Sequence, residues 1–157
     1  MRQRAIRFLS GALIVFGTSR AFASDLHIGR VAAQPGQPVT VPVTFIAGHG
    51  PAITALSSDI HFDKGLGNPR CAAGSALAGV DKVLNCAAVE PGVVRLLIFG
   101  LNQDPIPNGE VATVTFDVLK KGRHQLHRLR SVTTASDANG NSLRLARKSG
   151  TVRVGLP

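Results

Sequence analysis

Residues 36–45 read GQPVTVPVTF, and residues 109–118 read GEVATVTFDV. In the first stretch the valines and Phe45 occupy every second position, with threonines and Pro42 between them. The second stretch alternates apolar and polar side chains in the same way. A period of two with β-branched residues is typical of an antiparallel strand that buries one face. The two stretches predict an all-β sandwich, a scaffold that often presents a face or a loop to a partner.

Turn signals rich in Gly, Pro and Asn divide the rest of the chain at short intervals. No stretch after residue 23 has the period of a helix. We therefore expect an antiparallel β-sandwich of jelly-roll topology with about nine strands. The expected strands are residues 26–31, 39–45, 53–62, 83–89, 93–100, 111–119, 124–134, 142–145 and 151–154.

Three local features carry their own expectations. Pro42 lacks an N–H, so its strand is expected to lie at a sheet edge or to carry a bulge there. Residues 65–79 are rich in Gly and Ala, and we expect an irregular loop pinned by Cys71. The pair Asn139-Gly140 predicts a type I′ hairpin turn.

Residues 1–23 have the three parts of a secretory signal peptide. Three arginines make the start positive, residues 8–17 are apolar, and residues 21–23 read AFA, which fits a cleavage site. The apolar run is too short to span about 30 Å of bilayer as a helix. An uncleaved N-terminal anchor is the alternative. We expect one exported, soluble domain of residues 24–157, periplasmic or extracellular, with no membrane insertion after cleavage.

Two cysteines, Cys71 and Cys86, remain in the exported part. Disulfides persist in exported proteins, so we expect these two to be bridged. A bridge that closes a loop of this length stabilises a fold by roughly 3 kcal/mol. Two free thiols are the alternative, and a metal site would need further ligands that are not near in sequence.

Loss of residues 1–23 lowers the formal net charge from +9 to +5, leaving 14 basic and 9 acidic residues. Residues 120–153 hold nine basic residues and one acid, Asp137. Such a segment can attract an anionic glycan or a negatively charged protein, and a solvated basic surface is the alternative. Nucleic acid is not expected as a partner, because no exposed aromatic residues would stack on bases. The candidate basic surface consists of Lys120, Lys121, Arg123, Arg128 and Arg130.

Seven stretches carry a family resemblance: IGRV at 28–31, PGQPVTVPV at 35–43, IHFD at 60–63, VRLLIFG at 94–100, IPNGEVATVTF at 106–116, DANGN at 137–141 and GTVRV at 150–154. In this order and spacing they resemble the cohesin domain and, more broadly, the superfamily of carbohydrate-binding modules that shares its jelly-roll fold. The resemblance implies a nine-stranded, non-catalytic module. Such a module binds another protein, the dockerin, whose own fold depends on calcium, on one sheet face.

Many cohesins carry an Asn and an Asp on the third strand that contact the dockerin. Alignment on Phe62-Asp63 places these two positions at Ala55 and Ser57 of this chain. The resemblance therefore carries over the fold and the binding face, without these two contacts.

The candidate partner-binding face combines two expected strands. Alternation places Ser57, Asp59 and His61 on one face of the strand at 53–62. It likewise places Arg95, Leu97 and Phe99 on one face of the strand at 93–100. Apolar residues on that side would form an exposed patch beside polar groups, which is typical of a protein interface. The alternative is a central strand covered on both sides. The face consists of Ser57, Asp59, His61, Arg95, Leu97 and Phe99.

The second hypothesis is a carbohydrate-binding module. Sugar rings stack on exposed Trp and Tyr, and this chain has neither. Polysaccharide would therefore have to be bound through polar and basic residues. We expect charge reversal of Arg128 and Arg130 to weaken such binding and to leave a protein interface on the sheet face intact.

An enzyme is the third and weakest hypothesis, and no catalytic residues are assigned. Asp59 and His61 share a face, but no nucleophile elbow accompanies them. No cofactor or metal is expected, since residues 137–141 lack the Glu that closes a calcium loop. His124 and His127, three apart on a strand, would point to opposite faces.

Overall fold

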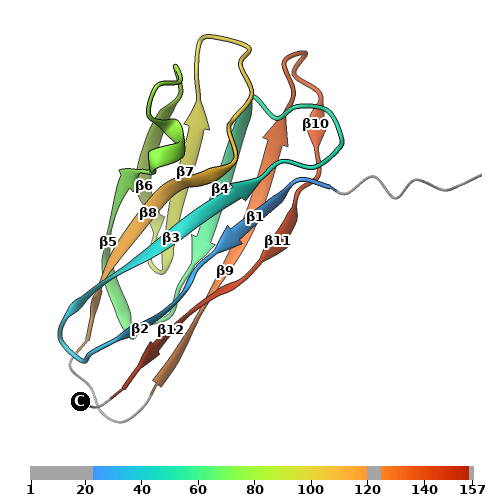
Figure 1. Cartoon of the computed structure of the whole chain (residues 1–157). Coiled ribbons are helices and arrows are strands. Elements are labelled where there is room, and N and C mark those ends of the chain that lie inside the picture. Colours follow the sequence, from blue (N-terminus) through green and yellow to red (C-terminus); the bar gives the residue numbers. More distant parts are fainter. Residues whose placement is uncertain (1–22, 120–124, 156–157) are drawn as a thin grey trace, which may run out of the picture.

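The computed structural model describes residues 23–119 and 125–155, which form a two-layer β-sandwich (Figure 1). Residues 1–22 of the expected signal peptide lie outside the described residues, as do Lys120, Lys121 and Arg123 of the expected basic surface. The described strands are β1 (Asp25–Ile28), β2 (Arg30–Ala33), β3 (Pro38–Ile46), β4 (Ala55–His61), β5 (Leu66–Ala73), β6 (Val83–Glu90), β7 (Val93–Phe99), β8 (Gly109–Val118), β9 (Gln125–Ser136), β10 (Ser142–Leu143), β11 (Ala146–Lys148) and β12 (Gly150–Val154), with one short 3₁₀ helix, η1 (Ser75–Leu77).

The all-β class is confirmed, and the strand count is corrected from about nine to twelve in the described residues. One added strand is β5, where a loop was expected. The other two arise because the first expected strand divides into β1 and β2, and because β11 precedes β12. No helix in the described part of the chain is long and apolar enough to cross a membrane.

The strands of the described residues form two sheets, and most neighbouring strands are antiparallel. The short sheet has the order β11-β1-β3-β8-β5. The long sheet has the order β2-β12-β9-β4-β7-β6, with β10 paired to β9. The apolar sides of the longer strands face the other sheet, so the core lies between the two layers.

The two alternating stretches lie in β3 and β8, which pair in the middle of the short sheet. The burial of β3 alternates as predicted, with its valines and Phe45 inside and Thr40 outside. Phe116 of β8 is fully buried, and its ring centroid lies 5.0 Å from that of Phe62. These residues carry most of the aromatic volume of the core.

Gly29 and Gly150 mark where the first and last strands pass from the short sheet to the long one. β1 is parallel to β11 in the short sheet, and β2 is parallel to β12 in the long sheet. At the crossing, the backbone N–H of Thr151 donates to the carbonyl of Gly29 at 3.2 Å. A Cβ on Gly150 would lie 2.4 Å from that carbonyl oxygen, so the close approach requires glycine.

Pro42 lies beside this crossing. The edge position expected for its strand is wrong, because β3 lies between β1 and β8. The N–H of Gly29 donates to the Pro42 carbonyl at 2.8 Å. The N–H and C=O of a strand residue point to the same side, so the missing Pro42 donor faces the point where β1 leaves the sheet. The irregularity of the β3–β8 pair lies one residue on, between Val43 and Thr44.

Residues 66–73 form β5 and not the expected irregular loop. They pair with β8, with a register shift between Gly67 and Arg70, and Asn68 adopts a φ of 47° within it. Arg70 donates from Nη2 to Asp117 Oδ1 at 2.7 Å across the pair. Cross-strand pairing thus makes a strand of a Gly- and Ala-rich segment whose own strand propensity is low.

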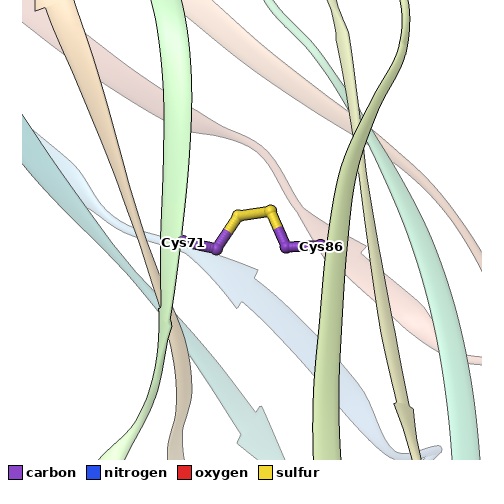
Figure 2. Close-up of a disulfide and its surroundings, with 2 residues drawn as sticks. All are labelled: Cys71 and Cys86. Atoms are coloured by element: carbon purple, nitrogen blue, oxygen red, sulfur yellow. A yellow bond between two sulfur atoms is a disulfide. The ribbon is translucent and has the colours of Figure 1, made fainter.

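The expected disulfide is present and joins the two sheets. Cys71 belongs to β5 and Cys86 to β6, and their Cα atoms are 6.1 Å apart (Figure 2). β5 is the edge of the short sheet and β6 is the edge of the long sheet. The bridge therefore fastens the sandwich along the side opposite to the crossing at Gly29.

The hairpin between β9 and β10 is present, but its turn is not of type I′. That type needs positive φ at both central residues, and Asn139 does not have it, whereas Gly140 has a φ of 79°. Asp137 decides the shape, because its Oδ1 accepts from the backbone N–H groups of Asn139 and Asn141, both at 2.9 Å. Its other oxygen accepts from the Asn141 side chain. The Asp137 carboxylate is thus satisfied by donors of its own loop.

The close approach at the crossing predicts a large effect for Gly150→Ala. The new methyl group would meet backbone and the Ile28 side chain, so the free energy of unfolding should fall by about 1–3 kcal/mol. Gly67→Ala is the control, since a Cβ there meets nothing within 4 Å. Urea unfolding measures both variants. Equal stability of the two would contradict the role assigned to Gly150.

The disulfide predicts a second stability effect. Replacing both Cys71 and Cys86 by Ala should lower the free energy of unfolding by roughly 3 kcal/mol, because the loop between them becomes free in the unfolded chain. Chemical unfolding with and without a reductant tests this. The double variant should be insensitive to the reductant, whereas the native protein should lose stability in it.

Candidate functional site

The outer face of the long sheet brings together all six residues predicted for the partner-binding face. In β4 the residues Ser57, Asp59 and His61 point outward, alternating with buried neighbours. In β7 the outward residues are Arg95, Leu97 and Phe99. The two strands are antiparallel neighbours, so the six side chains lie on one surface. We call this surface the outer face.

An ion pair occupies the middle of the outer face. Asp59 lies directly opposite Arg95 in the pairing of β4 with β7. The guanidinium donates from Nε to Oδ1 at 2.6 Å and from Nη2 to Oδ2 at 2.7 Å. This two-point hydrogen bond from Arg95 holds the pKa of the Asp59 carboxyl below its ordinary value. Both side chains are therefore held in one fixed orientation.

The apolar patch lies beside this pair, toward the end of β7. Leu97 and Phe99 are each 37% exposed, so β7 is not covered on its outer side. Of the two readings left open by the sequence, the exposed patch is the one that the structure has. Two residues that the sequence reasoning did not assign extend the patch: Val83, opposite Phe99 in β6, and Leu101, which is fully exposed. The apolar patch consists of Val83, Leu97, Phe99 and Leu101.

A buried lysine holds the loop that carries Leu101. Lys82 is 7% exposed, and its Nζ donates to the carbonyl and to Oδ1 of Asn102 at 3.3 and 2.7 Å. Gly100 sits against the Asp81 carbonyl, where a Cβ would come within 2.2 Å. The end of the apolar patch is thus built on a braced loop. Neither contact was predicted, because both depend on residues brought together by the fold.

A hollow opens on the outer face between the patch and the β9–β10 hairpin. It has a volume of about 270 Å³, and small or hydroxyl-bearing residues line most of it. Ala55 and Ser57 form part of its floor. The alignment given above places an Asn and an Asp of many cohesins at these two positions. Ala55 and Ser57 are smaller, so the surface is recessed here. The remaining polar lining includes Thr134, Ser136 and Ser142.

The described arginines of the basic surface lie on the same outer face. Arg128 and Arg130 of β9 are both exposed and alternate with buried residues, as predicted. Arg130 lies opposite His61 of β4. The two surfaces that the sequence kept apart are therefore one surface. The expectation that charge reversal of Arg128 and Arg130 leaves a protein interface intact assumed two separate surfaces, and the structure has one.

The described histidines lie apart from one another and have different surroundings. His61 is exposed next to the Asp59–Arg95 pair. His127 is 5% exposed, and its Nδ1 lies 2.6 Å from Asp63 Oδ1. This contact was not predicted, and it packs the end of β9 against the segment after β4. His124 lies outside the described residues, and the described residues contain no group of three or more His, Cys, Asp or Glu placed to hold a metal.

The family model of the cohesin domain matches residues 24–154. The fold resembles a non-cellulosomal cohesin from the hyperthermophilic archaeon Archaeoglobus fulgidus, with 20% identity, coverage of 84% of this chain and 91% of that one, and a TM-score of 0.68. It also resembles the third cohesin of ScaC from Acetivibrio cellulolyticus, solved with the ScaB dockerin, with 22% identity, coverage of 84% and 99%, and a TM-score of 0.71.

A third similar structure is a complex of the OlpA cohesin with a dockerin from Clostridium thermocellum, with 19% identity, coverage of 84% of this chain and 99% of that one, and a TM-score of 0.69. No curated protein matches the chain. At these identities the solved structures establish the fold. None of the three is described as binding polysaccharide, so they give no support to the glycan hypothesis.

The ion pair predicts a specific change in the titration of Asp59. Arg95→Gln should raise the pKa of Asp59 toward its ordinary value of 3.8, which NMR of the carboxyl carbon measures. Because the pKa is lowered in the folded protein, the pair stabilises the fold above about pH 3.8 and loses this effect as the pH falls through the folded value. The stability difference between native protein and variant should therefore shrink in acid. Asp137 should titrate identically in both proteins and serves as the internal control.

Proposed function

The chain belongs to the cohesin family, and from this premise we propose that it is an exported, non-catalytic module that docks a dockerin-bearing protein on its outer face. The observation that carries the proposal is the exposure of Leu97 and Phe99 beside the fixed Asp59–Arg95 pair. An exposed apolar patch next to oriented polar groups is the usual composition of a protein interface.

Export is part of the proposal. The family match begins at residue 24, directly after the AFA sequence at residues 21–23. A disulfide between Cys71 and Cys86 fits an oxidising compartment. We therefore propose that residues 1–23 are removed as a signal peptide and that residues 24–157 act in the periplasm or outside the cell.

The partner class rests on two of the similar structures, which are cohesins solved with dockerins. Ala55 and Ser57 remain the chain's departure from the usual contact residues. We propose that the partner places a larger side chain into the hollow that these two residues leave. A partner selected in this way would differ from those of cohesins with a filled surface.

A panel of purified dockerin modules tests the proposal by calorimetry against the exported protein, with calcium and with a chelator. At least one dockerin should bind in calcium and lose binding on chelation. Leu97→Glu should then weaken binding by about 30-fold or more, because it puts a charge into the part of the apolar patch that lies beside the Asp59–Arg95 pair.

Ile46→Glu is the matched control for this substitution. Ile46 is apolar and 42% exposed, close to the exposure of Leu97, but it lies at the end of β3 in the short sheet. Binding should change less than about twofold in this variant. Equal loss in both variants would place the interface elsewhere, and absence of any calcium-dependent binding would contradict the dockerin partner.

A further inference from the structure

Four arginines gather at the end of the outer face that lies away from the apolar patch. Thr151 of β12 lies between Arg128 of β9 and Arg30 of β2. Arg153 is two residues further along β12, and Arg130 two residues further along β9. All four side chains are exposed. We call them the arginine cluster: Arg30, Arg128, Arg130 and Arg153.

No described acidic side chain pairs with any member of the arginine cluster. The other arginines that the structure describes on strands have partners: Arg70 binds Asp117, Arg95 binds Asp59, and Arg147 donates to the Ser131 carbonyl at 3.1 Å. Asp63, which follows β4, is engaged with His127 and with the Gly65 N–H. The positive charge of the arginine cluster is therefore not neutralised by the described side chains around it.

The apolar residues that flank Arg128 and Arg130 on β9 favour a protein as the source of the missing negative charge. Leu126 and Val132 of β9 lie on the same side as Arg128 and Arg130, and they are 52% and 54% exposed. A hydrophilic polyanion would leave these apolar side chains in water. A protein surface that carries both apolar and acidic residues would cover them and neutralise the arginines together.

The arginine cluster and the apolar patch lie on the two sides of β4 in one sheet, since β9, β4 and β7 are consecutive neighbours (Figure 1). The Asp59–Arg95 pair and Val132 lie between them, paired across β4. The outer face therefore has an apolar end and an end that carries four exposed arginines. A partner that covers the whole face must match both ends.

We infer that the partner presents an acidic and apolar protein surface, with its carboxylates over the arginine cluster and its apolar side chains on Leu97 and Phe99. This inference rests on the proposed function, because it describes the partner of that same face. It adds a charge requirement: partners with a basic docking surface are excluded by repulsion.

The test uses defined probes, because it must not depend on the partner's identity. The exported protein, labelled with ¹⁵N, is titrated with a short peptide of alternating Leu and Glu, with its Leu and Lys counterpart, with oligoglutamate and with dextran sulfate. The Leu and Glu peptide should shift the amide signals of both Arg128 and Leu97. It should bind at least about tenfold tighter than each of the other three probes.

Two double variants separate the effect of the arginine cluster on binding from the effect of net charge. The double substitution Arg128→Glu and Arg130→Glu should weaken binding of the Leu and Glu peptide by about tenfold or more. The control is Arg144→Glu with Lys148→Glu, which changes the net charge equally at exposed positions in and beside β11 of the short sheet. The control should bind as the native protein does. Circular dichroism verifies that both double variants are folded.

The other outcomes overturn either the inference or the proposed function on which it rests. Dextran sulfate or oligoglutamate binding as tightly as the Leu and Glu peptide would make the arginine cluster a general polyanion site. Equal binding of the Glu and Lys peptides would make it a solvated surface. Calcium-dependent dockerin binding that survives Arg128→Glu with Arg130→Glu would uphold the proposed function and remove the charge requirement. Peptide binding without any dockerin binding would uphold the charge requirement and contradict the dockerin partner.

Discussion

The paired crossing at Gly29 and Gly150 is the constraint on which the rest of the sandwich depends. Two chain segments more than one hundred residues apart in sequence approach closely enough for Thr151 N–H to bond the Gly29 carbonyl. Because both strands change sheet at this point, each contributes to both layers and the layers cannot slide apart there. The Cys71–Cys86 bridge holds the opposite side. The strands between these two fastenings form a fixed platform.

The fixed strands hold the side chains of the outer face in set orientations. The Asp59–Arg95 pair is held by two hydrogen bonds across adjacent strands, so its groups are oriented before any partner arrives. The apolar patch lies on β6, on β7 and on a loop braced by Lys82. Interface residues that are already fixed lose little conformational entropy on binding, which favours affinity from a modest area.

The crossing also links the fold to the charge of the outer face. Arg30 and Arg153 lie just after the points at which the two terminal strands enter the long sheet. If these strands stayed in the short sheet, the two arginines would lie on another surface and the arginine cluster would contain only Arg128 and Arg130. The topology therefore adds positive charge to the end of the face opposite the apolar patch.

Alternation alone was sufficient to predict the core side of β3 and β4, because a strand places successive side chains on opposite faces whatever it pairs with. For β7 it left open whether the second side is covered as well. The six residues of the candidate face followed from the same rule applied to residues 53–62 and 93–100. The disulfide followed from two cysteines in an exported chain. Each of these features depends on local geometry or on composition, which the sequence contains in full.

Only the tertiary structure decided which strands are neighbours, and the failed expectations for residues 66–73 and for Pro42 both depend on neighbours. Residues 66–73 are a strand because β8 and Asp117 lie beside them, and Pro42 is tolerated inside a sheet because β1 leaves at that point. The turn at Gly140 follows the hydrogen bonds of Asp137 and not the Asn-Gly pair alone. The sequence determined the faces of single strands, whereas the union of the arginines with the apolar patch came from strand order, since pairing energy depends on contacts distant along the chain.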